Sequence, residues 1–146
     1  MKIRKPLIIM LALMMICIAS INVFAAEPSG QRTISDNIIT PCWTNTESMH
    51  LDLGFSGTRA DCSAMVIGKT GTSRITATVK LQRKNTDGTY TNVKTWAGLS
   101  ANGSTLTFND SYNVTCGYTY RLMINATVYK GGSGENVSKS VEKYCS

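Results

Sequence analysis

Apolar and polar residues alternate along most of the chain, which is the pattern of half-buried β-strands. The period-two runs cover residues 49–55, 62–66, 75–81, 90–96, 106–108, 118–128 and 137–145. Turn-forming segments such as Asn85–Gly88 and Gly131–Gly134 separate neighbouring runs. No window has an uninterrupted helical stripe of apolar residues, so the pattern predicts an all-β fold of seven or eight strands.

Residues 1–25 have the character of a removable export signal. Basic residues precede the apolar run Leu7–Ile18, and Val23–Ala25 forms a small-residue cleavage site. We expect cleavage after this site, a polar lead over 26–33 and one domain over 34–146. A retained membrane anchor is the alternative, but the apolar run is shorter than the ~20 residues of a spanning helix. The expected product is secreted and has no integral membrane segment.

The charge of the chain changes once the signal is set aside. Three of its 15 Lys and Arg residues lie in the signal, which leaves 12 basic against 9 acidic side chains. A net charge of +3 is too mild to indicate a nucleic-acid partner. It favours loose, salt-sensitive contact of the released protein with anionic wall polymers.

The cysteines predict disulfides. Cys17 lies in the signal, and the remaining Cys42, Cys62, Cys116 and Cys145 form an even set in an exported domain. A zinc site is the alternative, but the set contains no pair with zinc-knuckle spacing. Several pairings are possible. Because Cys116 precedes one predicted strand and Cys145 ends the next, we favour Cys116–Cys145, together with Cys42–Cys62.

The segment Val114–Leu122 favours a sandwich over a small barrel. Tyr120 follows Gly117 at the place of the tyrosine corner of immunoglobulin-like folds, where the hydroxyl bonds to upstream backbone. The alternative is that Tyr120 only packs in the core, since the full immunoglobulin pattern would have cysteine in place of Leu122. The predicted fold is an antiparallel immunoglobulin-like β-sandwich of seven to eight strands, stapled by disulfides.

Several short motifs within Ile75–Val128 carry a family resemblance. They are Leu81–Lys84, Asp87–Tyr90, Val93–Trp96 and Gly117–Leu122. With them, about half of the mature chain resembles a group of small, signal-bearing, functionally uncharacterised β-sandwich proteins exported by low-GC Gram-positive bacteria. The resemblance implies export and an immunoglobulin-like fold, and it supplies no catalytic residue.

The sequence shows no catalytic constellation. His50 is the only histidine, and alternation places it, with Asp52, opposite the apolar face of its strand. Asp61 flanks the same hairpin and is also expected to face solvent. Phosphate-binding loops, nucleophile elbows and calcium-ligand ladders do not occur. We therefore expect no catalytic residue, metal or cofactor, with a carboxylate-dependent hydrolase as the alternative.

Aromatic residues are the candidate binding positions, because flat rings supply contact area at low entropic cost. The candidates are Trp43, Tyr90, Trp96, Tyr112 and Tyr129. Trp96, Tyr90 and Tyr112 would form a site if they shared an exposed face, whereas the alternative for Trp96 is a place in the core. We expect a non-catalytic domain that binds an extracellular protein or glycan. A toxin-like effector or an inhibitor is the alternative.

Overall fold

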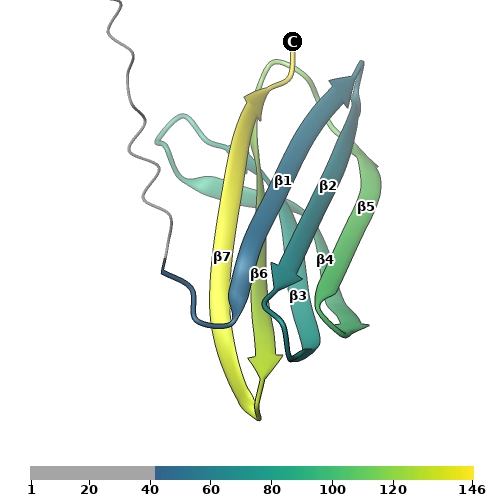
Figure 1. The fold of residues 1–146 in the computed structure, drawn as a ribbon. Coiled ribbons are helices and arrows are strands. Elements are labelled where there is room, and N and C mark those ends of the chain that lie inside the picture. Colours follow the sequence, from purple (N-terminus) through teal and green to yellow (C-terminus); the bar gives the residue numbers. More distant parts are fainter. Residues whose placement is uncertain (1–41) are drawn as a thin grey trace, which may run out of the picture. The chain divides into compact units, whose positions relative to one another are not determined.

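The computed structural model describes residues 42–146, which form seven β-strands (Figure 1). The strands are β1 (Thr46–Ser56), β2 (Arg59–Gly68), β3 (Thr72–Lys84), β4 (Tyr90–Asn102), β5 (Thr105–Asn113), β6 (Thr119–Lys130) and β7 (Ser133–Tyr144). The expected signal, the polar lead and the first residues of the expected domain lie outside this range. In the described part of the chain, no helix is long and apolar enough to span a membrane.

The strands form two antiparallel sheets that pack face to face. One sheet has the order β1-β2-β5 and the other has the order β4-β3-β6-β7. Figure 1 shows β1 of the first sheet beside β7 of the second, at one edge of the sandwich. The seven-stranded antiparallel sandwich confirms the predicted fold class, and each period-two run of the sequence lies in or overlaps a strand.

Alternation along the strands fills the space between the sheets. Ile75, Val79, Leu122 and Ile124 are fully buried, and the residues that directly alternate with them, such as Thr76 and Met123, point to the outer face. Burial of apolar side chains on both inner faces is the main stabilising contribution in such a sandwich. One detail differs from the sequence pattern: Tyr118 precedes β6 and is exposed, with Arg83 over its ring.

Edge strand β4 carries two irregularities in its pairing with β3. Asn92 lies opposite Gln82 and Lys94 lies opposite Leu81, which leaves Val93 as an extra residue. A second register shift leaves 97–98 opposite a single residue of β3. Gly98 has a φ of 70°, which suits glycine at such a bulge. Each extra residue shifts the alternation of inward and outward side chains by one position. Between the two bulges, the even-numbered side chains of β4 therefore point inward.

Two charged side chains of β7 form hydrogen bonds to the backbone of β1 and of the segment that leads into it, at one edge of the sandwich. The Glu135 carboxylate accepts hydrogen bonds from the backbone N–H groups of Thr44, Asn45 and Thr46 and from the Thr46 hydroxyl. Further along, the Lys139 ammonium donates to the Met49 carbonyl oxygen at 2.6 Å. β7 is an edge strand of its sheet, and charged side chains are common on such edges.

Candidate functional site

The outer face of the four-stranded sheet is hollowed by a groove of about 560 Å³. The groove crosses all four strands and is lined on its outer side by small polar side chains. We call it the polar groove; its outward side chains are Thr76, Thr78, Ser100, Asn125, Thr127, Asn136 and Ser138. All of them are neutral hydroxyl or amide groups.

Strand register places these side chains in two rows across the sheet. In one row, Thr76 of β3 lies opposite both Ser100 of β4 and Thr127 of β6, and Thr127 lies opposite Asn136 of β7. In the next row, Thr78 of β3 lies opposite Asn125 of β6. On β3 and β6 these residues are shorter than the outward side chains on either side along the strand, so the face is recessed there.

Longer and charged side chains bound the polar groove at both ends. Arg74 and Tyr129 lie one row beyond it toward one end, with the guanidinium carbon 4.4 Å from the ring centroid. Lys80 and Met123 lie one row beyond it toward the other end. The groove is therefore a neutral recess between cationic ends.

Tyr90 lies in a charged network on the same outer face, nearer the end of the sheet. The Arg121 guanidinium stacks on the Tyr90 ring at 3.5 Å and donates two hydrogen bonds to the Gln82 amide oxygen. The Tyr90 hydroxyl donates to the Glu142 carboxylate, which also accepts from Lys84. The bond from Tyr90, followed by the bond and charge of Lys84, lowers the pKa of Glu142 despite its partial desolvation.

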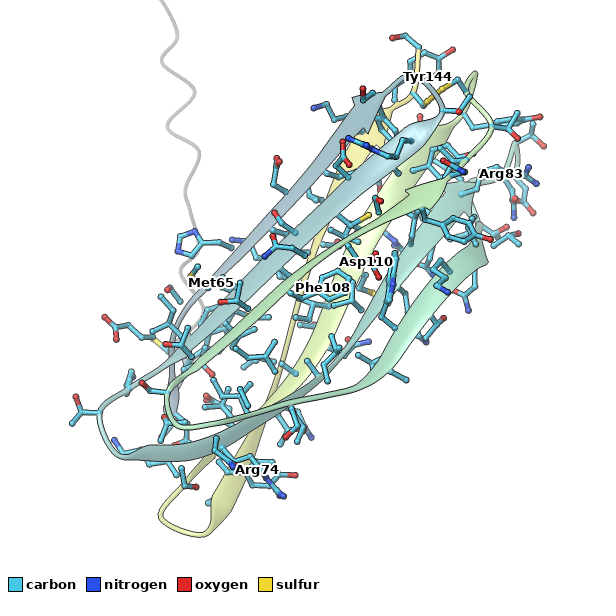
Figure 2. All side chains as sticks on the ribbon, turned by 90° about the vertical axis from the view of Figure 1, so that its right-hand side faces the viewer. Met65, Arg74, Arg83, Phe108, Asp110 and Tyr144 are labelled. Carbon is cyan, nitrogen blue, oxygen red and sulfur yellow. A yellow bond between two sulfur atoms is a disulfide. The ribbon has the colours of Figure 1, made fainter. Side chains whose placement is uncertain are left out.

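Trp96 and Tyr112 lie on another side of the molecule, where β4 and β5 form the second edge of the sandwich. The Trp96 ring packs on Phe108 at 5.1 Å, and its indole N–H donates to Asp110 at 2.6 Å. Lys94 lies within 6 Å of both the Trp96 and the Tyr112 ring centroids. Figure 2 shows Phe108 and Asp110 close together along β5. Trp96 is half-buried against the core, as its alternative assignment expected, while Tyr112 is 37% exposed.

The three aromatic candidates therefore do not share one face. Trp96 and Tyr112 come together around Lys94, whereas Tyr90 lies over Arg121 on the outer face. Of the wider set, Trp43 packs against the core and Tyr129 lies at one end of the polar groove.

One of the two favoured disulfides forms and the other does not. Cys116 and Cys145 are bonded, with their Cα atoms 4.8 Å apart, whereas Cys42 and Cys62 are free thiols. The hairpin register explains the wrong pairing, because Cys62 lies opposite Leu53 while Thr46 already lies opposite Gly68. Cys42 precedes Thr46, and the seven residue steps from Thr46 to Leu53 span roughly 23 Å of strand, far more than a disulfide bridges.

Tyr120 makes the hydrogen bond that its position predicted. Its ring is buried, with 2% of the residue exposed, and its hydroxyl donates to the Thr115 carbonyl oxygen at 2.6 Å. The ring also packs at a tilt against Phe55 from the opposite sheet. Tyr120 thereby joins the turn before β6 to the core.

The acidic and histidine candidates of the first hairpin face solvent. His50 and Asp52 are exposed, and Asp61 pairs with Arg59 at 2.9 Å. Among residues 42–146, no group of three or more His, Cys, Asp or Glu side chains could hold a metal ion. The positions of Asp52 and Asp61 agree with the solvated role expected from alternation.

Sequence reasoning missed the polar groove, although each strand carries a signal for it. Small polar residues recur at outward positions two apart, as in Thr76 and Thr78, and again in Asn125 and Thr127. Period-two analysis identifies each pair as solvent-facing. Only the strand order and register bring pairs from distant parts of the chain to one place.

Comparison with known proteins adds two structural similarities. No protein-family model and no curated protein matches the chain. The sporulation control protein Spo0M from Bacillus subtilis is 11% identical with a TM-score of 0.47, over 70% of this chain. CsgH from R. palustris is 10% identical with a TM-score of 0.39, over 62% of this chain and 88% of its own. The match spans 49% of the Spo0M chain.

Proposed function

We propose that this protein is an exported, non-catalytic immunoglobulin-like domain that binds a carbohydrate chain through the polar groove. The observation that carries the proposal is the pair of cross-strand rows of hydroxyl and amide groups. Export is expected from the signal over 1–25, and the immunoglobulin-like assignment is supported by the hydrogen bond from Tyr120 to Thr115.

The lining of the polar groove suits a hydroxyl-rich ligand. Hydroxyl and amide side chains both donate and accept hydrogen bonds, as sugar hydroxyls do. Within the lining, Thr127 donates to Asn136 at 2.7 Å, and this is the one hydrogen bond between two of its side chains. The remaining capacity faces outward into the recess. Because no carboxylate lines the groove, its side chains are suited to binding rather than to the acid–base chemistry of a hydrolase.

A protein partner is the second candidate, and the cluster at the β4–β5 edge is the observation that favours it. Trp96, Tyr112 and Lys94 combine aromatic surface with a cation, a composition found at protein interfaces. Trp96, however, is already engaged with Phe108 and Asp110. The cluster therefore leaves chiefly Tyr112 to contact a partner, whereas the polar groove presents several hydrogen-bonding side chains to a glycan. A toxin-like effector or an inhibitor would act through such a protein contact.

The test is binding of the exported, oxidised protein to a panel of neutral and acidic polysaccharides, measured by affinity electrophoresis. The double variant Asn125→Ala/Thr127→Val removes hydrogen-bonding groups from both rows with little change in side-chain volume at Thr127. Its matched control is Thr107→Val/Asn109→Ala, which changes the same residue types, two apart, on the outer face of the three-stranded sheet.

The proposal expects retardation of the protein by at least one polysaccharide, loss of that retardation in the groove variant and its retention in the control. Equal loss in both variants would place binding elsewhere. Absence of retardation by the whole panel would reject the proposed function, and a pull-down with immobilised protein and its Tyr112→Ala variant would then test the protein-partner alternative.

A further inference from the structure

The two outer faces of the sandwich differ in charge. On the four-stranded sheet, register places Arg74, Lys80, Lys84 and Arg121 outward together with one carboxylate, Glu142. The outer face of the three-stranded sheet instead carries Asp52, Asp61 and Arg59. The positive charge of the folded domain is therefore concentrated on the face that contains the polar groove.

The cations nearest the polar groove have unused hydrogen-bonding capacity. Lys84 pairs with Glu142, so these two charges compensate each other. Within residues 42–146, neither Lys80 nor Arg74 makes a side-chain hydrogen bond or ion pair. Arg74 makes a cation–π contact with the Tyr129 ring. Arg121 uses two of its nitrogens on Gln82 and keeps further N–H donors.

We infer that the ligand of the polar groove is an acidic polysaccharide, whose carboxylates are held by Arg74 at one end and by Lys80 and Arg121 at the other. This inference rests on the proposed function and narrows its ligand class. Charge complementarity is its basis, because a desolvated or partly enclosed carboxylate forms strong, charge-assisted hydrogen bonds with guanidinium and ammonium groups.

The spacing of the cations indicates a polymer rather than a small anion. Arg74 and Lys80 are six residues apart on one strand, which corresponds to roughly 20 Å. A single carboxylate cannot reach both, whereas charges recurring along a chain can. Figure 2 shows Arg74 near one end of the molecule and Arg83, later on β3, toward the other, which gives the direction along which such a chain could extend.

The neutral middle of the polar groove favours a polysaccharide over a nucleic acid. Each nucleic-acid strand carries one charge per about 3.4 Å, so several phosphates would lie over the uncharged rows. An acidic polysaccharide in which uronic acids alternate with neutral sugars, such as hyaluronan, instead separates its carboxylates by neutral hydroxylated rings. This matches the order of cation, hydroxyl and amide rows, and cation along the face.

The experiment compares hyaluronan with the same polymer after methyl esterification of its carboxylates, with polygalacturonate and alginate, which carry a carboxylate on every ring, and with poly(dT). We expect hyaluronan to bind at least about tenfold more tightly than its ester, with affinity that falls as salt is added. The variant Arg74→Gln/Lys80→Gln should remove this preference while leaving residual binding of the ester unchanged.

The matched control is Arg59→Gln/Lys143→Gln, which lowers the net charge by the same amount away from the polar groove. If the two charge variants weaken the preference for the acidic polymer equally, net charge alone explains that preference and the inference is wrong. Equal binding of acid and ester, or tighter binding of polygalacturonate, alginate or poly(dT), would also overturn it. Binding of neutral polymers alone, abolished by Asn125→Ala/Thr127→Val, would leave the proposed function standing without the acidic ligand.

Discussion

The Tyr120 hydroxyl donates a hydrogen bond to the Thr115 carbonyl oxygen, five residues upstream, across the turn that leads into β6. The same turn contains Cys116, whose bond to Cys145 ties it to the end of β7. A side-chain hydrogen bond and a covalent bond thus hold one end of the sandwich at adjacent residues.

Replacing Tyr120 by Phe should lower the free energy of unfolding by about 1–3 kcal/mol, because it leaves the Thr115 carbonyl without its partner in a part-buried site. The matched variant Tyr129→Phe removes a hydroxyl from the outer face and should change stability by no more than about 0.5 kcal/mol. Denaturant melts of the two oxidised variants provide the measurement. Equal midpoints would show that the corner hydrogen bond contributes nothing.

Glu135 should make stability depend on acid pH. Desolvation, the largest single influence, raises its pKa, but the hydrogen bonds from Thr44, Asn45 and Thr46 together outweigh it, and the pKa lies below 4.5. The folded state therefore favours the carboxylate. Its contribution is present above pH 4.5 and is lost as pH falls through the lowered pKa.

The test is Glu135→Gln, which should cost about 1–2 kcal/mol at pH 7, where a charged acceptor is lost. The cost should shrink as the pH falls through the lowered pKa of Glu135, where the wild-type carboxyl is protonated too. Glu47→Gln, at an exposed position of β1, is the control and should show no such pH-dependent difference. A pH-independent cost for Glu135→Gln would assign its effect to packing.

The disulfide between Cys116 and Cys145 should contribute about 2–4 kcal/mol to stability, mainly by restricting the unfolded chain. The double variant Cys116→Ala/Cys145→Ala should lower the denaturant midpoint accordingly. Adding a reductant should lower the wild-type midpoint by a similar amount and leave that of the variant unchanged. A reductant effect on the double variant would require a second disulfide.

The two free thiols should differ sharply in reactivity. Burial, followed by the charges of Asp110 and Asp61, raises the pKa of Cys62 to about 12, and 3% of the residue is exposed. Cys42 is exposed. Iodoacetamide should therefore alkylate Cys42 in the native protein and reach Cys62 only after unfolding, since the thiolate is the reactive form. Mass spectrometry of the labelled peptides provides the measurement. If neither residue is labelled in denaturant, Cys42 and Cys62 are bonded to each other and their assignment as free thiols is wrong.

Local pattern predicted the strands and the hydrogen bond of Tyr120, because both depend on residues close together in sequence. Alternation identifies a strand by itself, and Tyr120 reaches backbone only five residues away. The Cys116–Cys145 bond could be predicted for a related reason, because the two cysteines flank one hairpin.

The register between strands could not be predicted from the pattern of apolar and polar residues. It separates Cys42 from Cys62, and it assembles the polar groove from residues as distant as Thr76 and Asn136. The bulge at Val93 shows the same limit within one strand. Strict alternation places Tyr90 and Trp96 on the same face, but the extra residue inverts the phase and turns Trp96 inward.

The two bulges of β4 also determine how separate molecules can meet. A regular edge strand exposes a row of N–H and C=O groups on which another chain can align, and such alignment is a route to fibrils. The extra residues at Val93 and at 97–98 break the spacing of this row, so a straight strand cannot pair with β4 along its whole length. On the opposite edge, Lys139 and Lys143 place charge along β7. Neither edge of the four-stranded sheet is therefore a continuous template on which another chain can polymerise.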